Sequence, residues 1–147
     1  MSTDNYTVTF AVERSPDEVF AAINNVRGWW SGEITGDAER LGAEFTYRVK
    51  DVHYSAQRVT EFIPGSKIVW HVTDALLSFV EDTQEWKGTE IIFEIMPSAQ
   101  GSTVRFTHRG LVPAFACFDA CSNGWNMLIN NNLRNFILTG AVQPSPW

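Results

Sequence analysis

The chain has 147 residues, about the length of one domain, so we expect a single domain over residues 1–147. Its 11 basic and 17 acidic residues give a net charge of −6 with no run of Lys or Arg, so a nucleic-acid partner is not expected. The N-terminus lacks a basic start, and no stretch approaches the roughly 18 to 20 apolar residues of a membrane span, which predicts a soluble, cytoplasmic protein.

The first elements are a strand and a short helix. Residues Tyr6 to Val12 alternate large apolar with small or polar side chains, which predicts a half-buried strand. Ser15 can cap a helix that begins at Pro16, and Glu18 completes a capping box. We expect this helix to run to about Asn24, with a second short helix just before the Gly28-Trp29-Trp30 break.

The middle of the chain predicts antiparallel strands joined by short turns. The expected strands, in chain order, are Phe45 to Val49, a segment beginning at Val59, Lys67 to Val72, Thr89 to Met96 and Thr103 to His108. The segment Lys50 to Ser55 is expected to be a turn, and Thr73 to Lys87 is either a long loop or a further strand pair.

The last element is a long amphipathic helix, expected from Pro113 to Gly140. Its buried stripe recurs at helical spacing and comprises Phe118, Trp125, Leu128, Ile129, Leu133 and Phe136. The solvated side is expected to hold Asn126, Asn130, Asn131, Asn132 and Asn135. Because the strands are grouped rather than alternating with helices, the sequence predicts an α+β fold.

Residues two apart on each predicted strand identify the face that would meet this helix. The expected inward residues are Val8, Phe10, Val12, Phe45, Tyr47, Val49, Ile68, Trp70, Val72, Ile91, Phe93, Ile95, Val104, Phe106 and His108. A curved sheet around a helix can leave a hollow between them. The aromatic side chains could therefore line a ligand pocket or close it as a solid core, and both interpretations stay open.

Three histidines and two cysteines are the side chains best suited to catalysis, metal binding or redox chemistry. His108 could act as an acid or base or contact a ligand, or it could pair with a nearby backbone or carboxylate group. His53 and His71 are expected in solvent. Cys117 and Cys121 lie four apart on the final helix and are expected to be reduced packing thiols, with a redox pair or metal half-site as the alternative.

The chain carries no recognisable catalytic or metal motif. It lacks an HExxH spacing, a GxSxG elbow and a glycine-rich phosphate loop. We therefore expect no metal, no cofactor and no assigned catalytic residue. A cyclase needs little more than a shaped pocket and one acid or base, so an enzyme remains an alternative.

Several short motifs together resemble a known family. They are Trp29-Trp30, the run WKGTEIIFEI from Trp86 to Ile95, the run TVRFTHRGL from Thr103 to Leu111, Gly124-Trp125 with Leu133, and Thr139-Gly140. In this order they resemble the activator of heat-shock-protein-90 ATPase homologue-like proteins of the START and birch-pollen-allergen-like (SRPBCC) superfamily. The resemblance implies a helix-grip fold: a curved antiparallel β-sheet wrapped around a long C-terminal α-helix, with two short helices after the first strand.

The resemblance implies a range of functions, because the superfamily includes lipid carriers, hormone receptors, cyclases and aromatases. The family's eukaryotic co-chaperones carry an additional N-terminal domain. Because this chain begins at the first strand, we expect a small-molecule ligand more than a chaperone partner. A homodimer is left open.

We predict that the protein binds a small hydrophobic, aromatic or lipid-like molecule between sheet and helix. Trp70, Phe93 and Trp125 would line the cavity, with His108 and Tyr47 as polar contacts. The full predicted ligand-binding set is Trp30, Tyr47, Trp70, Trp86, Phe93, Phe106, His108, Phe118, Trp125 and Ile129. The alternatives are a cyclase or hydrolase that uses His108 and a module that stimulates a chaperone ATPase.

Overall fold

A curved sheet of seven antiparallel strands forms one layer of the computed structural model, which describes residues 5–30 and 32–144. The strands occur in the order β1-β7-β6-β5-β4-β3-β2 across the sheet. Their bounds are β1 (Tyr6–Val12), β2 (Glu33–Gly36), β3 (Glu44–Val49), β4 (His53–Ile63), β5 (Lys67–Leu77), β6 (Glu90–Ser98) and β7 (Gly101–Arg109).

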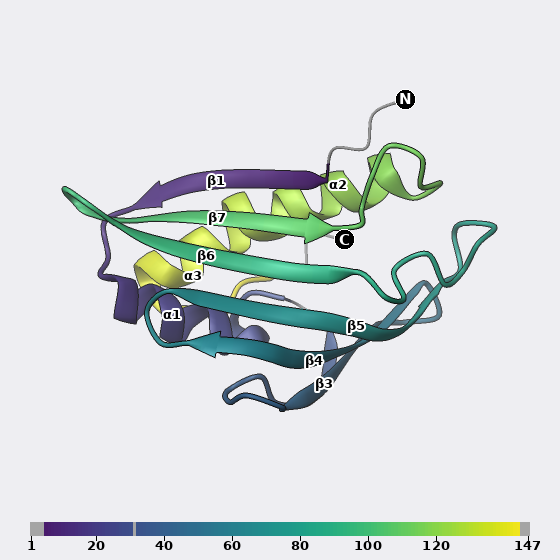
Figure 1. Cartoon of the computed structure of the whole chain (residues 1–147), viewed down its shortest axis with the longest axis horizontal. Coiled ribbons are helices and arrows are strands. Elements are labelled where there is room, and N and C mark those ends of the chain that lie inside the picture. Colours follow the sequence, from purple (N-terminus) through teal and green to yellow (C-terminus); the bar gives the residue numbers. More distant parts are fainter. Residues whose placement is uncertain (1–4, 31, 145–147) are drawn as a thin grey trace.

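The helices form the second layer, behind the sheet in Figure 1. Their bounds are α1 (Pro16–Asn24), the 3-10 turn η1 (Val26–Gly28), α2 (Phe118–Asn126), the π-helical η2 (Met127–Leu133) and α3 (Arg134–Thr139). The last three elements follow one another without a break and form the long C-terminal helix. This arrangement confirms the predicted α+β helix-grip fold.

The first helix has the predicted capping box. The Ser15 hydroxyl accepts a hydrogen bond from the Glu18 backbone N–H at 3.2 Å, and the Glu18 carboxylate reaches back to the Ser15 backbone N–H. Helix α1 ends at Asn24, as its sequence predicts.

The long helix begins later than predicted. Residues 113–117 form turns, and the helix starts at Phe118. The carboxylate of Glu85, from the loop after β5, accepts hydrogen bonds from the backbone N–H groups of Ala116 at 2.8 Å and Cys117 at 3.1 Å. These contacts satisfy donors that a helix start otherwise leaves free, and they join residues about thirty positions apart, so local patterning does not reveal them.

One asparagine of the helix departs from the predicted solvated side. Asn132 is buried, and its Nδ2 donates to the backbone oxygens of Trp29 at 3.2 Å and Pro144 at 2.9 Å. At regular helical spacing Asn132 falls four residues after Leu128 and three after Ile129, so it lies on the buried stripe itself, where its amide finds backbone acceptors. The prediction for Asn132 was therefore wrong.

Two strands of the middle region also differ from expectation. Strand β4 begins at His53, not Val59, and two register shifts interrupt its pairing with β5, between Ala56 and Gln57 and between Val59 and Glu61. Such bulges break the alternation by which a strand is recognised. Strand β5 extends to Leu77, and the short edge strand β2 was not predicted.

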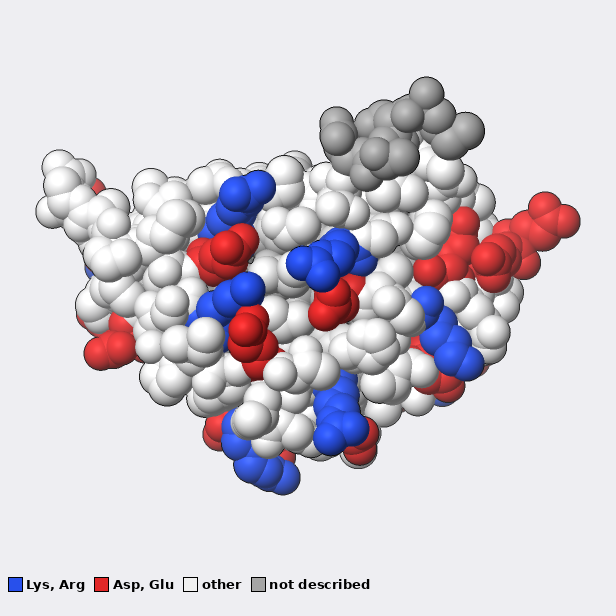
Figure 2. Space-filling view, in the orientation of Figure 1, with Lys and Arg blue, Asp and Glu red and all other residues white. Residues whose placement is uncertain are grey.

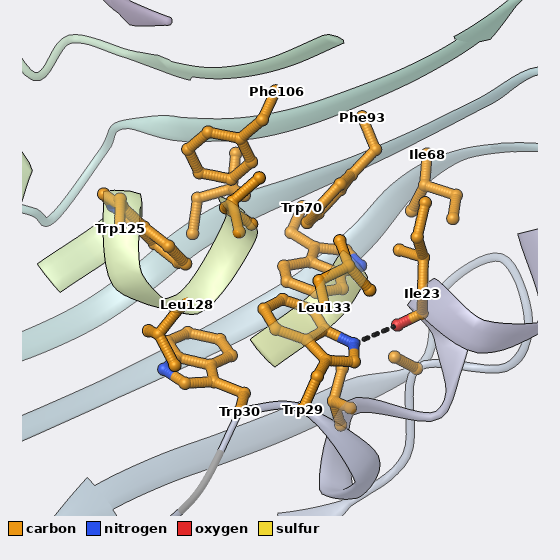
Figure 3. Packing of buried hydrophobic residues seen from close by; sticks show 14 of the residues in the cluster. Ile23, Trp29, Trp30, Ile68, Trp70, Phe93, Phe106, Trp125, Leu128 and Leu133 are labelled. Carbon is orange, nitrogen blue, oxygen red and sulfur yellow. Dashed lines mark hydrogen bonds between the residues drawn. The ribbon is translucent and has the colours of Figure 1, made fainter. Parts of the chain in front are cut away.

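The predicted inward residues are buried or half-buried, which confirms the phase assigned to the strands. Figure 3 shows how their aromatic rings meet the helix. Trp29, Trp30 and Trp70 stack with ring centroids 6.0 to 6.3 Å apart, and Phe93 meets Trp70 edge-on at 5.0 Å. The Trp29 indole N–H donates to the Ile23 carbonyl at 3.2 Å, which satisfies a buried donor. This part of the interior is a solid core.

The outer face of the sheet carries charges of both signs, interspersed in Figure 2. Arg109 pairs with Glu90 at 2.8 Å across β7 and β6, and Lys67 pairs with Glu61 at 3.1 Å across β5 and β4. Over residues 5–30 and 32–144, no helix is long and apolar enough to cross a membrane.

Candidate ligand-binding site

A cavity of about 350 Å³ lies where the turn between β3 and β4 approaches the start of the long helix. It is lined by Trp30, Tyr47, Val49, Lys50, Val52, His53, Phe79, Trp86, Ala120, Cys121, Asn123, Gly124, Trp125, Met127 and Leu128. The sheet, the loop after β5 and the α2–η2 junction thus each contribute one wall.

Five aromatic side chains around the cavity contact one another in a closed ring. Trp30 stacks on Tyr47 with ring centroids 4.2 Å apart, and Trp86 stacks on Trp125 with ring centroids 5.6 Å apart. His53 joins the two stacks on one side, with its ring 5.3 Å from that of Tyr47 and 4.7 Å from that of Trp86. Trp30 and Trp125 close the circle at 5.2 Å. Because each side chain contacts two neighbours, this circle of five aromatic side chains is a rigid, preformed wall.

His53 is a cavity residue, so the prediction that it lies in solvent was wrong. It starts β4 with its side chain half-buried, and burial lowers its pKa to about 4, so the imidazole is neutral near pH 7. His53 Nε2 lies 3.4 Å from the Ser55 hydroxyl, which also accepts a hydrogen bond from Gln57 Nε2. The hydroxyl proton can then point at His53 Nε2, which places the imidazole proton on Nδ1.

His71, the other histidine expected in solvent, is half-buried on β5. Its cross-strand neighbours are Arg58 on β4 and Glu90 on β6. The side chains of a central strand are flanked on both sides, which explains the partial burial.

His108 lies one layer behind the cavity and is completely buried. The Trp125 indole N–H donates to its Nδ1 at 3.0 Å, so the ring proton is on Nε2. Nε2 lies 2.8 Å from the Thr89 hydroxyl, which in turn lies 2.6 Å from the Trp86 carbonyl oxygen. Both ring nitrogens are therefore occupied by the protein's own groups.

Burial, with a smaller contribution from the nearby His53, lowers the pKa of His108 to about 3. An imidazole with this pKa stays neutral near pH 7 and has no free nitrogen to exchange a proton with a ligand. The geometry assigns His108 to a supporting role: it holds the Trp125 indole against the Trp86 ring.

The structure places four of the ten predicted ligand-binding residues around the cavity: Trp30, Tyr47, Trp86 and Trp125. The remaining six do not line it. Four of them are fully buried core residues: Trp70, Phe93, Phe106 and Ile129. His108 lies behind the circle of five aromatic side chains, and Phe118 is partly buried and packs against the core. The hollow occupies only one end of the helix, because large aromatic side chains fill the remainder of the space between helix and sheet.

Most of the cavity lining was not predicted. The unpredicted lining residues are Val49 at the end of β3, Lys50 and Val52 in the following turn, His53, Phe79, and the helix residues Ala120, Cys121, Asn123, Gly124, Met127 and Leu128. The small side chains of Ala120 and Gly124 stand four apart on α2, which leaves room on one face of the helix. This spacing was the available signal for the cavity wall in the sequence.

Both cysteines are free and buried, which agrees with packing thiols. The hydrogen bond with Cys121 and burial raise the pKa of the Cys117 thiol, so it is protonated and a poor nucleophile near pH 7. Over the described ranges, no group of three or more His, Cys, Asp or Glu side chains is placed to hold a metal ion.

Solved structures with the same fold are numerous. The solution structure of the Aha1 dimer from Colwellia psychrerythraea aligns with a TM-score of 0.73 and 23% identity over 93% of this chain and 98% of that one. Protein MLL2253 from Mesorhizobium loti aligns with a TM-score of 0.73 and 14% identity, over 92% and 96% of the two chains. Protein CV1439 from Chromobacterium violaceum aligns with a TM-score of 0.67 and 14% identity, over 92% of this chain and 98% of that one.

No curated protein sequence matches the chain significantly. The family model described as "Activator of Hsp90 ATPase homolog 1-like protein" matches residues 13–137, which include every strand from β2 to β7 and almost all of the long helix. The chain therefore belongs to the Activator of Hsp90 ATPase homolog 1-like protein family.

Proposed function

We propose that the protein binds a small, largely apolar aromatic molecule in the cavity between the β3–β4 turn and the long helix. The observation that carries this proposal is a preformed hollow of about 350 Å³ bounded by five aromatic side chains in mutual contact. Its volume falls within the range of about 300 to 1,000 Å³ that is usual for small-molecule sites.

The chemistry of the lining supports an apolar ligand. Trp30, Trp86 and Trp125 offer indole surfaces, and Leu128 and Met127 add aliphatic and thioether surface. A flat ring could stack on these side chains and gain both apolar burial and aromatic contact. His53 and Asn123 are polar lining groups that could orient such a ligand.

The cavity mouth also exposes apolar side chains. Val52 is 46% exposed and Phe79 is 45% exposed, and both line the cavity. Large apolar side chains grouped at the rim of a hollow are typical of a ligand entrance.

The neutral fluorophore N-phenyl-1-naphthylamine tests this proposal, because its emission rises when it enters an apolar site. We expect saturable binding at one site per chain, together with quenching of tryptophan emission. The Ala120→Phe variant places a ring in the cavity and should weaken binding by about tenfold or more, since the probe loses roughly a ring's worth of apolar contact.

The matched control is Ala21→Phe, which makes the same change on an exposed helical alanine of α1 outside the cavity. It should bind the probe as the parent protein does. Binding that is absent in the parent protein, or that survives unchanged in Ala120→Phe, would overturn the proposal.

A further inference from the structure

Among the residues that the structure describes, one charged side chain lines the cavity, and it is a cation. Lys50 lines the mouth, while the rest of the lining is aliphatic, aromatic, sulfur-containing or neutral polar. His53 does not add a second positive charge near pH 7, because burial keeps its imidazole neutral. A ligand that enters this cavity therefore meets one positive charge and no carboxylate of the lining.

Lys50 has no ionic partner within residues 5–30 and 32–144. Lys67, by contrast, forms an ion pair with Glu61 on the outer face of the sheet. The Lys50 side chain is exposed, so its ammonium can stay hydrated at the mouth while its aliphatic stem borders the apolar interior. The charge is thus available to a ligand.

The backbone at Lys50 points to a role for this side chain. Its φ is 48°, in the left-handed region that residues other than glycine and asparagine rarely adopt. The residue sits in the tight turn between β3 and β4, where the Val52 N–H donates to the Val49 carbonyl at 3.1 Å. A lysine in a position that suits glycine, at the mouth of a cavity, is the kind of strained residue from which a functional role can be inferred.

We propose that the ligand is an aromatic anion, whose ring enters the aromatic part of the cavity and whose carboxylate or comparable acidic group pairs with the Lys50 ammonium at the mouth. This inference rests on the proposed function and specifies its ligand class. The apolar part of such a ligand would lie inside the cavity, and its negative charge would lie at the solvent-exposed mouth.

A matched pair of probes separates the two proposals. 8-Anilino-1-naphthalenesulfonate is N-phenyl-1-naphthylamine with one added sulfonate, so the two differ in charge and share the aromatic body. In Lys50→Gln, the affinity for the sulfonate probe should fall about fivefold, the factor expected for one charge pair at a solvent-exposed mouth, while the affinity for the neutral probe changes by less than about twofold.

The control variant is Lys87→Gln, which removes the same charge from an exposed lysine that does not line the cavity. It should leave both affinities unchanged. If Lys50→Gln binds the sulfonate probe as tightly as the parent protein, the anion inference fails while the proposed function stands. If the neutral probe does not bind the parent protein, the proposed function itself fails.

The Lys50→Gly variant supplies a second, independent readout. Glycine relieves the left-handed backbone, so the melting temperature should rise, while the affinity for the sulfonate probe falls as in Lys50→Gln. A variant that is more stable yet binds the anion less well would show that the lysine is present for its charge. A more stable variant with undiminished anion affinity would overturn the inference.

Discussion

The stability of the protein should decrease on mild acidification because of His108. This imidazole is completely buried, and its pKa is about 3 in the folded protein against about 6.5 in an unfolded chain. Between these two values the unfolded state binds the proton and the folded state does not. The contribution of His108 is therefore fully present above pH 6.5 and is lost progressively as the pH falls toward 3.

The expected magnitude follows from the pH interval. Each pH unit below about 6.5 lowers the free energy of unfolding by about 1.4 kcal/mol, so at about pH 5 the loss through His108 alone is about 2 kcal/mol. Carboxylates and His53 add their own pH dependence, but they are present equally in a His108 variant. The difference between the parent protein and that variant isolates the His108 contribution.

The assay is urea unfolding at about pH 7.5 and about pH 5, followed by far-ultraviolet circular dichroism. His108→Phe should be less stable at the higher pH by about 1 to 3 kcal/mol, because the buried Trp125 indole N–H loses its acceptor. Its pH difference should be about 2 kcal/mol smaller than that of the parent protein.

The control is Thr89→Val, which disrupts the same network by removing the hydroxyl 2.8 Å from His108 Nε2 but keeps the histidine. It should lower stability at both pH values and retain the pH difference. If His108→Phe shows the full pH difference of the parent protein, His108 is not the buried, neutral group that these contacts describe.

Two hydrogen-bonded contacts, one of them buried, give further predictions. Asn132→Ala should lower the free energy of unfolding by about 1 to 3 kcal/mol in urea titrations, because the buried Trp29 carbonyl loses its donor. The control Asn131→Ala, at an exposed neighbouring position, should change the free energy of unfolding by no more than about 0.5 kcal/mol. Equal effects at both positions would contradict the assigned role of Asn132. Glu85→Ala should cost about 1 kcal/mol and speed amide hydrogen exchange at Ala116 and Cys117, since their N–H groups lose the carboxylate cap. Exchange that is no faster than in the exposed control Glu81→Ala would refute that capping role.

The sequence was most informative where the physical signal is local. The alternation in β1, β3, β6 and β7 follows from a period of two, and the Ser15 capping box follows from residues three apart. The π-helical segment and the two bulges in the β4–β5 pairing were not predicted, because each inserts a residue that shifts the phase of a regular pattern.

The site was less predictable than the fold, since a cavity depends on which side chains fail to fill a space. Trp70 and Phe93 have the same inward phase as Tyr47, yet they close the core around Trp29, while Tyr47 borders the hollow. Lys50 lies in a turn, and no periodic pattern assigns a turn residue to the mouth of a cavity. Contacts between residues far apart in the sequence, such as the cap by Glu85, carry no local sequence signal at all.

The most direct test of the binding account uses the indole N–H signals of the tryptophans in a ¹⁵N-labelled sample, assigned by single Trp→Phe substitutions and titrated with N-phenyl-1-naphthylamine. Ring currents from the bound probe should shift the signals of Trp30, Trp86 and Trp125, which line the cavity, and leave those of the core residues Trp29 and Trp70 nearly unmoved. Saturable shifts confined to the first three would support a ligand in this cavity. Shifts of the core pair alone, or no shift in any of the five, would contradict it.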